Sequence, residues 1–395
     1  MARSRTIVIA GAGIGGLTAA LALTRAGFRA VVLEQAERLE EAGAGIQLSP
    51  NATRVLFDLG LAERLRPLVV APESIRIVNG RSGRDIVRVP LGETAAQRYG
   101  APYWVIHRAD LQAVLTTAIA ENPDVTLRLA ARVEDFVIHP HGVTIEARDA
   151  QGLRDEQGIA LVGADGLWST LRTRLGERRS PHFAHRTAWR AVVPAAGLTD
   201  EFRESVTGLW LGRDAHLVHY PVKGGREVNI VAIVRDDWHE PGWSAPGRQG
   251  ELAPRFAGFA PQARALIAIP DRWQKWALFD RPPGRPRTKD PVTLLGDAAH
   301  PMLPFLAQGG AMAIEDAAVL AACLSRDEDT TRALRAFERA RRVRVARAQH
   351  EARRNSWRYH LSGPLGFARN AVLRAMGGEK LLRRFDWLYG WRQEN

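Results

Sequence analysis

The chain of 395 residues exceeds the length of one ordinary hydrophobic core, which predicts two domains. A composition of 46% hydrophobic and 25% charged residues is typical of a soluble globular protein and excludes a disordered or fibrous one. No apolar run reaches about 18 residues, so no membrane-spanning helix is expected. The single cysteine, Cys323, excludes a disulfide framework and favours the reducing cytoplasm, and the net charge of +12 favours anionic small molecules as ligands.

The first predicted elements are a strand, a glycine turn, a helix and a second strand. The apolar run "TIVIA" (6–10) leads into "GAGIGG", and a helical pattern follows over 17–27, where Gly27 is a plausible C-cap. The segment "RAVVLE" (29–34) then has the composition of a buried strand. This order is typical of a βαβ unit with a parallel sheet.

The glycine turn has the spacing of a dinucleotide-binding loop. Gly11 permits a tight turn, Gly13 lets a pyrophosphate approach the backbone, and Gly16 lets the helix pack close to the strand. The helix N-terminus offers N–H groups to the phosphates, and Glu34 ends the next strand, where a carboxylate accepts from ribose hydroxyls. Because a carboxylate there repels a 2′-phosphate, FAD or NAD is favoured over NADP. The predicted site also includes two neighbours of these residues, Gly15 and Gln35.

The middle of the chain is expected to form strands of two kinds. Residues 71–103 alternate between apolar and polar, with Asn-Gly and Ser-Gly turns, which predicts half-exposed antiparallel strands. A helix is expected over 107–121 and further strands over 125–163. Runs such as "AHLVHYPV" and "VNIVAIV" between 183 and 280 predict a second, largely antiparallel sheet. The Pro/Arg-rich stretch 280–291 is expected to be a surface loop, and the chain from 309 onward to be helical.

The expected fold is therefore α/β, with a Rossmann-like domain on a parallel sheet and an inserted domain on a largely antiparallel sheet. The first domain is predicted to be discontinuous, over 1–70, 104–180 and 286–350. The inserted substrate-binding domain would comprise 71–103 and 181–285, and a helical segment would follow over 351–395. A ligand is expected in the cleft between the two domains.

Two more segments place polar residues at strand ends. In "LVGADGLWSTLRTRL" (161–175) an apolar strand ends near Asp165, and Ser169 and Arg172 follow on a predicted helix, although an Asp-Gly turn alone is common. In "VTLLGDAAHPMLPFLAQGGAMAIEDAAVL" (292–320) Asp297 follows a buried strand, and Gly309 and the next residues open a helix. A carboxylate and free backbone N–H groups around one point predict a bound ligand.

Nine arginines and only two glutamates lie between residues 331 and 354. Such a cluster is compatible with a nucleic-acid-binding arm. A long solvated helix with one basic face is the favoured interpretation, since no series of aromatic residues is interleaved to stack on bases.

Taken together, these motifs resemble those of the single-component FAD-dependent aromatic hydroxylases, a group that includes salicylate, 3-hydroxybenzoate and 6-hydroxynicotinate hydroxylases. The resemblance covers nearly the whole chain, since "GAGIQLSPNATRVLFDLGL" (43–61), "HRADL" (107–111) and "FDWLYG" (385–390) also match. It implies that FAD is the bound cofactor. It also implies that Asp297 accepts from the ribitol hydroxyls and that Gly309, Gly310 and Ala311 face the flavin N1–C2=O edge.

The resemblance assigns further residues to the cofactor. It implies that Arg108 lies at the pyrophosphate or ribose, that Asp165 serves both FAD and the nicotinamide cofactor, and that Gln47 and His300 lie near the isoalloxazine. No metal site is expected. Ala307 departs from the pattern, because many members have glycine there and an Asn at Ala311 or the next residue, which favours the salicylate-type subgroup.

The implied reaction consumes NADH or NADPH and O2 and hydroxylates an activated aromatic ring through a C4a-hydroperoxyflavin, with or without loss of CO2. Strand alternation places His216 and Tyr220 on one face and His219 on the other. The resemblance assigns His216 and Tyr220 to the substrate pocket, with His216 as the base, and Pro301 to the oxygen pocket. Candidates for the anchor of the substrate carboxylate are Arg190 and Arg84, and candidate aromatic walls are Trp189, Trp210 and Phe305.

Alternatives remain at this stage. An NAD-dependent dehydrogenase would share the first glycine motif but would not explain the segment around Asp297. The same flavin fold would also serve a polycyclic or quinone-like substrate. The sequence does not distinguish NADH from NADPH or a monomer from a homodimer.

Overall fold

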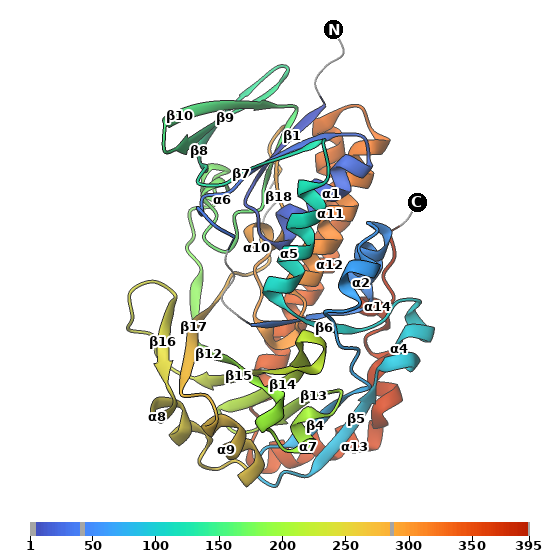
Figure 1. Cartoon of the computed structure of the whole chain (residues 1–395), viewed down its shortest axis with the longest axis vertical. Helices are drawn as coiled ribbons and strands as arrows, with labels where there is room; N and C mark the ends of the chain where they lie inside the picture. Colours follow the sequence, from blue (N-terminus) through green and yellow to red (C-terminus); the bar gives the residue numbers. More distant parts are fainter. Residues whose placement is uncertain (1–4, 40–43, 285–287, 394–395) are drawn as a thin grey trace.

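The computed structural model describes residues 5–39, 44–284 and 288–393 (Figure 1). Residue 43 of the motif 43–61, the first four residues of the chain and residues 285–287 of the expected loop 280–291 lie outside this description. In the upper half of Figure 1 a five-stranded sheet has the order β18-β11-β1-β2-β7, and all its neighbouring strands are parallel. The strands are β1 (Thr6–Ala10), β2 (Arg29–Leu33), β7 (Val125–Arg128), β11 (Ala160–Gly163) and β18 (Val292–Leu294).

Both faces of this parallel sheet are covered, which explains the continuous apolar runs of its strands. Ile7, Ile9 and Val162 pack on one face against helices α1 (Ile14–Arg25), α5 (Arg108–Ala120) and α11 (Gly309–Arg326). Val8 and Leu161 pack on the other face. There they meet the antiparallel sheet of β8 (Arg132–His139), β9 (Gly142–Asp149) and β10 (Gly152–Gly158).

An eight-stranded sheet forms the lower half of the molecule, with the order β16-β17-β12-β15-β14-β13-β4-β5 (Figure 1). All its neighbouring strands are antiparallel except β4 and β13, so the expected largely antiparallel sheet is confirmed. Its strands are β4 (Ser74–Asn79), β5 (Asp85–Pro90), β12 (His182–Pro194), β13 (Val206–Leu211), β14 (Ala215–Val222), β15 (Glu227–Arg235), β16 (Ser244–Arg248) and β17 (Arg272–Asp280). One face packs against α7 (Asp200–Arg203), α8 (Gln249–Leu252) and α9 (Pro261–Ala268).

One helix, α4 (Gly92–Tyr99), lies where only strands were expected, within 71–103. Its buried residues Ala95 and Tyr99 are four positions apart, and Gly100 ends it in a left-handed conformation with φ 73°. This helical pattern begins just after the alternating strands end, and the expectation of strands alone was wrong there.

The C-terminal part is helical, as expected, and consists of α12 (Thr330–Arg358), α13 (Gly363–Arg383) and α14 (Asp386–Tyr389). The arginine-rich α12 does not present all its charge to solvent. Arg341 is buried against Glu315 and Asp316, with N–O distances of 2.7 and 2.6 Å, and Arg353 pairs with Asp280 at 2.6 Å. No helix in the described ranges is long and apolar enough to cross a membrane.

The remaining elements are short. They are β3 (Gly45–Leu48) paired with β6 (Trp104–His107), the helices α2 (Pro50–Asp58), α3 (Ala62–Leu65), α6 (Thr170–Arg174) and α10 (Gly296–Ala299), and the 3-10 turns η1 (Ala195–Gly197), η2 (Lys223–Gly225), η3 (Ala253–Phe256) and η4 (Pro304–Leu306).

A buried histidine on the helix-covered face of the large sheet provides a test of this packing. His219 is 1% exposed, its ring lies 4.9 Å from that of Phe202, and its nitrogens have no hydrogen-bond partner among the described residues. Burial, and secondarily Arg76, lowers the pKa of His219 to about 3. As the pH falls below the ordinary value of about 6.5, the unfolded chain therefore binds this proton while the folded protein does not, and stability is lost.

We expect His219→Leu to reduce the loss of unfolding free energy between pH 7.5 and pH 4.5 by about 2–3 kcal/mol. The reason is that residue 219 then no longer binds a proton on unfolding over the roughly two pH units between its ordinary pKa and pH 4.5. Urea unfolding at the two pH values measures this loss. The exposed His141 at the β8–β9 turn is the control, because His141→Leu should leave it unchanged. Equal losses in the wild type and His219→Leu would contradict the prediction.

Candidate active site

The first site motif is the turn between β1 and α1. Gly11 has a φ of +106° and donates its N–H to the carbonyl of Leu33 at 2.7 Å, and a Cβ there would lie 2.5 Å from the carbonyl oxygen of Ala164. A Cβ at Gly16 would lie 1.9 Å from the carbonyl oxygen of Gly11, so neither position accepts a side chain. At Gly13, the N-cap of α1, a Cβ would meet no atom within 4 Å, which leaves the helix N-terminus open to a phosphate.

Glu34 lies directly after β2 and beside this turn. Its two carboxylate oxygens accept from the backbone N–H groups of Ala12 and Ala36 at 2.7 and 2.9 Å. The neighbouring Gln35 is exposed, while Gly15 faces Leu295 in the interior. The Glu34 carboxylate is thus held at the strand end, where the hydroxyls of an adenosine ribose would meet it.

The second motif, residues 161–175, supports the third motif, residues 292–320. Asp165 accepts from the N–H of Leu171 at 3.2 Å, and burial raises the pKa of its carboxyl, an effect that bonds from Ser169 and the backbone reduce. The Ser169 hydroxyl caps α6 by accepting from the N–H of Arg172 at 2.9 Å. The buried Arg172 guanidinium then donates to the carbonyls of Ala298 and Ala299, both at 2.9 Å. The "GADGLWSTLR" segment therefore fixes α10, the short helix that carries Asp297.

The third motif brings Asp297 to the N-terminus of α11. A Cβ on Gly309 would lie 3.7 Å from Asp297 Oδ1, and a Cβ on Gly310 would lie 2.7 Å from Ile46 Cδ1. Ala311 follows as a buried residue in the first turn of the helix. Burial raises the pKa of Asp297, although His300 and Arg108 oppose this effect. The first turn of α11 leaves backbone N–H groups without intrahelical acceptors beside this carboxylate.

A cavity of about 860 Å³ lies between the third motif and the large sheet, and no described residue of the first two motifs lines it. Residues from both halves line it, including Gln47, Arg108, Asp297, Gly309 and Gly310 from the motifs and His216, Val218 and Tyr220 from β14. The predicted alternation of β14 is thus observed, with His219 on the opposite face. A volume of this size lies within the usual range for small-molecule and cofactor sites.

The structure separates the remaining candidates by the sheet face on which they lie. Arg190 and Phe305 line the cavity, whereas Trp189 and Trp210 belong to the core under α8 and α9. Arg84 is exposed in the β4–β5 turn and does not reach the cavity.

The residues of the segment after α10 lie on different sides of it. Pro301 is buried and its carbonyl accepts from Gln349 at 2.7 Å, but it is not among the residues that line the cavity, whereas its neighbour Met302 is. The Nε2–H of His300 donates to the Asp316 carboxylate at 2.5 Å, on the interior side of the same segment.

Two residues in or beside the cavity escaped the sequence analysis. The Tyr103 hydroxyl donates to Gln47 at 2.5 Å, and His360, which lies after α12, bonds to His216 with 2.9 Å between Nε2 and Nδ1. Nothing in the local sequence singles out His360, since it lies 144 positions from its partner.

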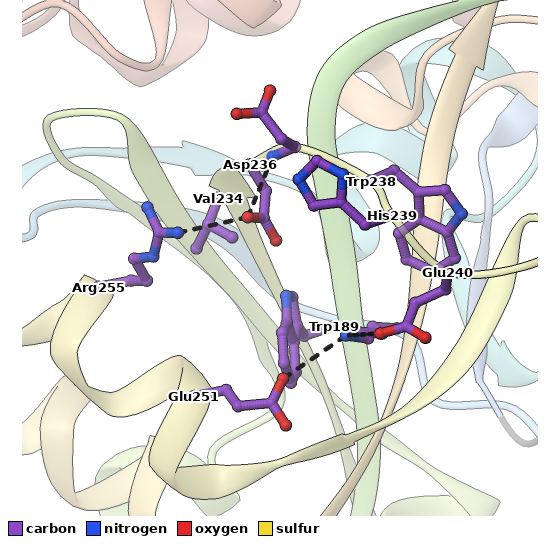
Figure 2. Close-up of a pocket in the computed structure, with 10 residues that line it drawn as sticks. Trp189, Val234, Asp236, Trp238, His239, Glu240, Glu251 and Arg255 are labelled. Carbon is purple, nitrogen blue, oxygen red and sulfur yellow. Dashed lines mark hydrogen bonds and ion pairs between the residues drawn. The ribbon is translucent and has the colours of Figure 1, made fainter.

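A second, smaller pocket of about 220 Å³ lies at the other end of the large sheet (Figure 2). Both of its Lys/Arg side chains are paired with carboxylates, Arg255 with Asp236 at 3.3 Å and Lys275 with Glu240 and Glu251 at 3.3 and 3.5 Å. It contains none of the motif residues, so the larger cavity is the candidate active site.

Asp297 provides a direct test of the cofactor site. We expect Asp297→Ala to weaken FAD binding by about 10-fold to 100-fold, because hydrogen bonds to a charged group contribute about 1.5–3 kcal/mol. Titration of the apoprotein with FAD, followed by flavin fluorescence, gives the Kd. The exposed Asp271 lies outside the cavity, and Asp271→Ala is the matched control. A Kd within twofold of the wild type for Asp297→Ala would exclude this role.

Comparison with known proteins agrees with this geometry. The sequence profile of a family described as an FAD binding domain matches residues 4–354. The chain is 40% identical to 3-hydroxybenzoate 6-hydroxylase 1 of Aquipseudomonas alcaligenes over 97% of each chain, and 34% identical to 6-hydroxynicotinate 3-monooxygenase of Bordetella bronchiseptica over 89% of this chain and 91% of that relative. Its structure resembles a variant of HpxO from Klebsiella pneumoniae complexed with FAD, with a TM-score of 0.86, 27% identity, and 98% and 99% of the two chains covered. The chain therefore belongs to the FAD-dependent aromatic hydroxylases.

Proposed function

We propose that the protein hydroxylates a small aromatic acid with a ring hydroxyl, using O2 and either NADH or NADPH. One observation carries this proposal: His216, Tyr220 and Arg190 line the same cavity as Asp297 and the start of α11. A ring hydroxyl would meet His216 and Tyr220 there. A carboxylate would meet Arg190, and the flavin edge would meet the start of α11. When bound, FAD accepts a hydride from the nicotinamide and passes one oxygen atom of O2 to the ring.

Arg190 is the proposed anchor for the substrate carboxylate. It lies on the cavity face of β12, and its guanidinium stacks over the ring of Trp276 with 5.1 Å to the ring centroid. This cation–π contact restrains the side chain, and the planar guanidinium suits the geometry of a carboxylate. Its positive charge also reaches Tyr220, since it opposes the rise in the pKa of that phenol.

The opposite end of the substrate would face His216 and Tyr220. Burial, followed by the influence of His360 and Arg186, holds the pKa of His216 well below its ordinary value, so the imidazole is neutral near pH 7 and accepts a hydrogen bond. Burial raises the pKa of Tyr220 far above neutral, so its hydroxyl keeps its proton and donates. One acceptor and one donor thus face a ring hydroxyl.

The size of the cavity favours a single-ring acid. The isoalloxazine must occupy part of the same space, and only the remainder is open to the substrate. This supports an acid of the size of hydroxybenzoate or hydroxynicotinate over a polycyclic or quinone-like compound. The lone cysteine, Cys323, suits the cytoplasm, which we propose as the location.

The visible spectrum of the purified protein, followed by NADH and NADPH oxidation with aromatic acids, tests this function. We expect a flavin spectrum and oxidation that salicylate, 3-hydroxybenzoate or 6-hydroxynicotinate accelerates, with oxygen uptake and a hydroxylated product. Bound flavin with no response to any hydroxylated aromatic acid would refute the proposed substrate class.

Arg190 and Arg84 form a matched pair for the carboxylate anchor. We expect Arg190→Met to raise the Kd for the stimulating acid by about 10-fold to 100-fold, since a charge-assisted hydrogen bond contributes about 1.5–3 kcal/mol. Arg84→Met should leave the Kd unchanged, because this side chain is exposed away from the cavity. Perturbation of the flavin absorbance on titration gives the Kd, and equal values for the two variants would refute the assignment.

A further inference from the structure

A second imidazole lies directly behind His216. His216 is on β14, and His360 is in the short connection between α12 and α13. The His216 Nδ1 and His360 Nε2 atoms are 2.9 Å apart, and the two ring centroids are 5.0 Å apart. Of these two bonded nitrogens, one must donate and the other accept. The protonation of His360 therefore determines which nitrogen of His216 carries its proton.

The backbone determines the tautomer of His360. Its Nδ1 lies 2.6 Å from the carbonyl oxygen of Ser356, and a carbonyl only accepts, so Nδ1 carries a proton. Burial, and then Arg186, lowers the pKa of His360 to about 4, so roughly one molecule in a thousand carries a second proton near pH 7. His360 Nε2 is therefore an acceptor.

The tautomer of His360 determines that of His216. Its Nδ1 must donate to His360, so in the neutral ring Nε2 keeps a lone pair. The described residues provide no hydrogen bond to Nε2, and His216 lines the cavity. The nitrogen left for a ligand is thus an acceptor, which is the form that a ring hydroxyl requires.

His360 is itself held in place by an arginine from the next helix. Arg369 Nη1 donates to the carbonyls of Arg358, Tyr359 and Leu361 at 2.9, 3.0 and 3.3 Å. These bonds close the connection that carries His360. The rings of Phe305 and Tyr359 flank His216, each with 5.4 Å between centroids, and restrict its rotation.

We propose that His360 is a positioning residue that holds His216 in the Nδ1–H tautomer, so that Nε2 accepts the ring hydroxyl of the aromatic acid. This inference rests on the proposed function for the identity of the ligand, but not for the tautomer. When the hydroxyl gives its proton to Nε2, the O–H bond breaks, an N–H bond forms, and the resulting imidazolium donates from Nδ1 to neutral His360.

The groups around the pair are mainly cationic. Arg186 on β12 and Arg369 on α13 lower the pKa of His360, and Asp214, between β13 and β14, opposes them. A neutral imidazole in the position of His360 supports the imidazolium of His216 without a further buried charge.

Substitutions that keep or remove the acceptor test the tautomer. The protein is labelled with 15N-histidine, and two-bond 1H–15N spectra at pH 7 distinguish protonated ring nitrogens from those with a lone pair. We expect His216 as Nδ1–H in the wild type and in His360→Gln, whose side-chain oxygen still accepts. In His360→Phe, which keeps the ring but not the acceptor, we expect a shift toward Nε2–H.

His350, on α12, is the matched control. Its Nδ1 bonds to the carbonyl of Ala346 at 2.7 Å, the same type of bond four residues back, but it is exposed. His350→Phe should leave the His216 signals unchanged. An Nε2–H tautomer of His216 in the wild type, or an unchanged tautomer in His360→Phe, would overturn the inference.

Ligand binding to the holoenzyme provides the second measurement. We expect His360→Phe to raise the Kd for 3-hydroxybenzoate about tenfold and to leave that for benzoate, which lacks the hydroxyl, unchanged. His360→Gln should restore the wild-type preference for the hydroxylated acid. Equal effects on both acids would reduce His360 to a purely structural residue. If neither acid binds the wild type, the proposed function fails, while the NMR result still decides the tautomer.

Discussion

The ionic contacts of two adjacent acidic residues in α11 hold the cofactor site together. Asp316 accepts from the N–H of Gly296 at 2.9 Å, bonds His300 at 2.5 Å and receives Arg341 Nε at 2.6 Å. Burial alone would raise its pKa, but His300 and Arg341 bring it to about 2. Because a buried carboxylate is costly unless it is fully paired, this one residue keeps α10, the following loop and α12 in a fixed arrangement. The position of Asp297 relative to the N-terminus of α11 depends on it.

The arginine-rich helix continues this arrangement toward the substrate cavity. Arg344 pairs with Glu315 at 2.6 Å and also donates to the carbonyls of Trp387 and Leu388, which ties down the C-terminal "FDWLYG" segment. Further along α12, Gln349 and Asn355 donate to the carbonyls of Pro301 and Phe305 at 2.7 and 3.2 Å. Three of the arginines between residues 331 and 354 thus pair inside the protein, namely Arg341, Arg344 and Arg353, while the other six are exposed. The polar side chains of α12 support the 301–306 segment, and His360 follows two residues after the helix ends.

Sequence alone could predict those parts of the site in which neighbouring residues act together. The turn at Gly11, the carboxylate of Glu34 and the segment from Asp297 to Gly310 depend on short-range geometry, and the resemblance to known hydroxylases supplied their roles. Alternation also predicted that His216 and Tyr220 share a face. It could not show which face of a strand meets the cavity, so Trp189 on β12 remained a candidate until the structure placed it in the core. The bond between His216 and His360 depends on the position of the α12–α13 connection beside β14, which no local pattern reveals.

The charged groups that line the cavity also determine which ligand it suits. Its cationic lining includes Arg108, Arg190 and Arg369, while Asp297 is held at the cofactor end. A carboxylate in the place of His360 would raise the pKa of His216, and the imidazole would then become charged before the substrate arrives. A neutral partner leaves His216 able to accept a proton, and it leaves the positive field available to the anionic acid. The two requirements, an acceptor at one end of the ring and a cation at the other, are compatible because His360, the hydrogen-bond partner of His216, is neutral.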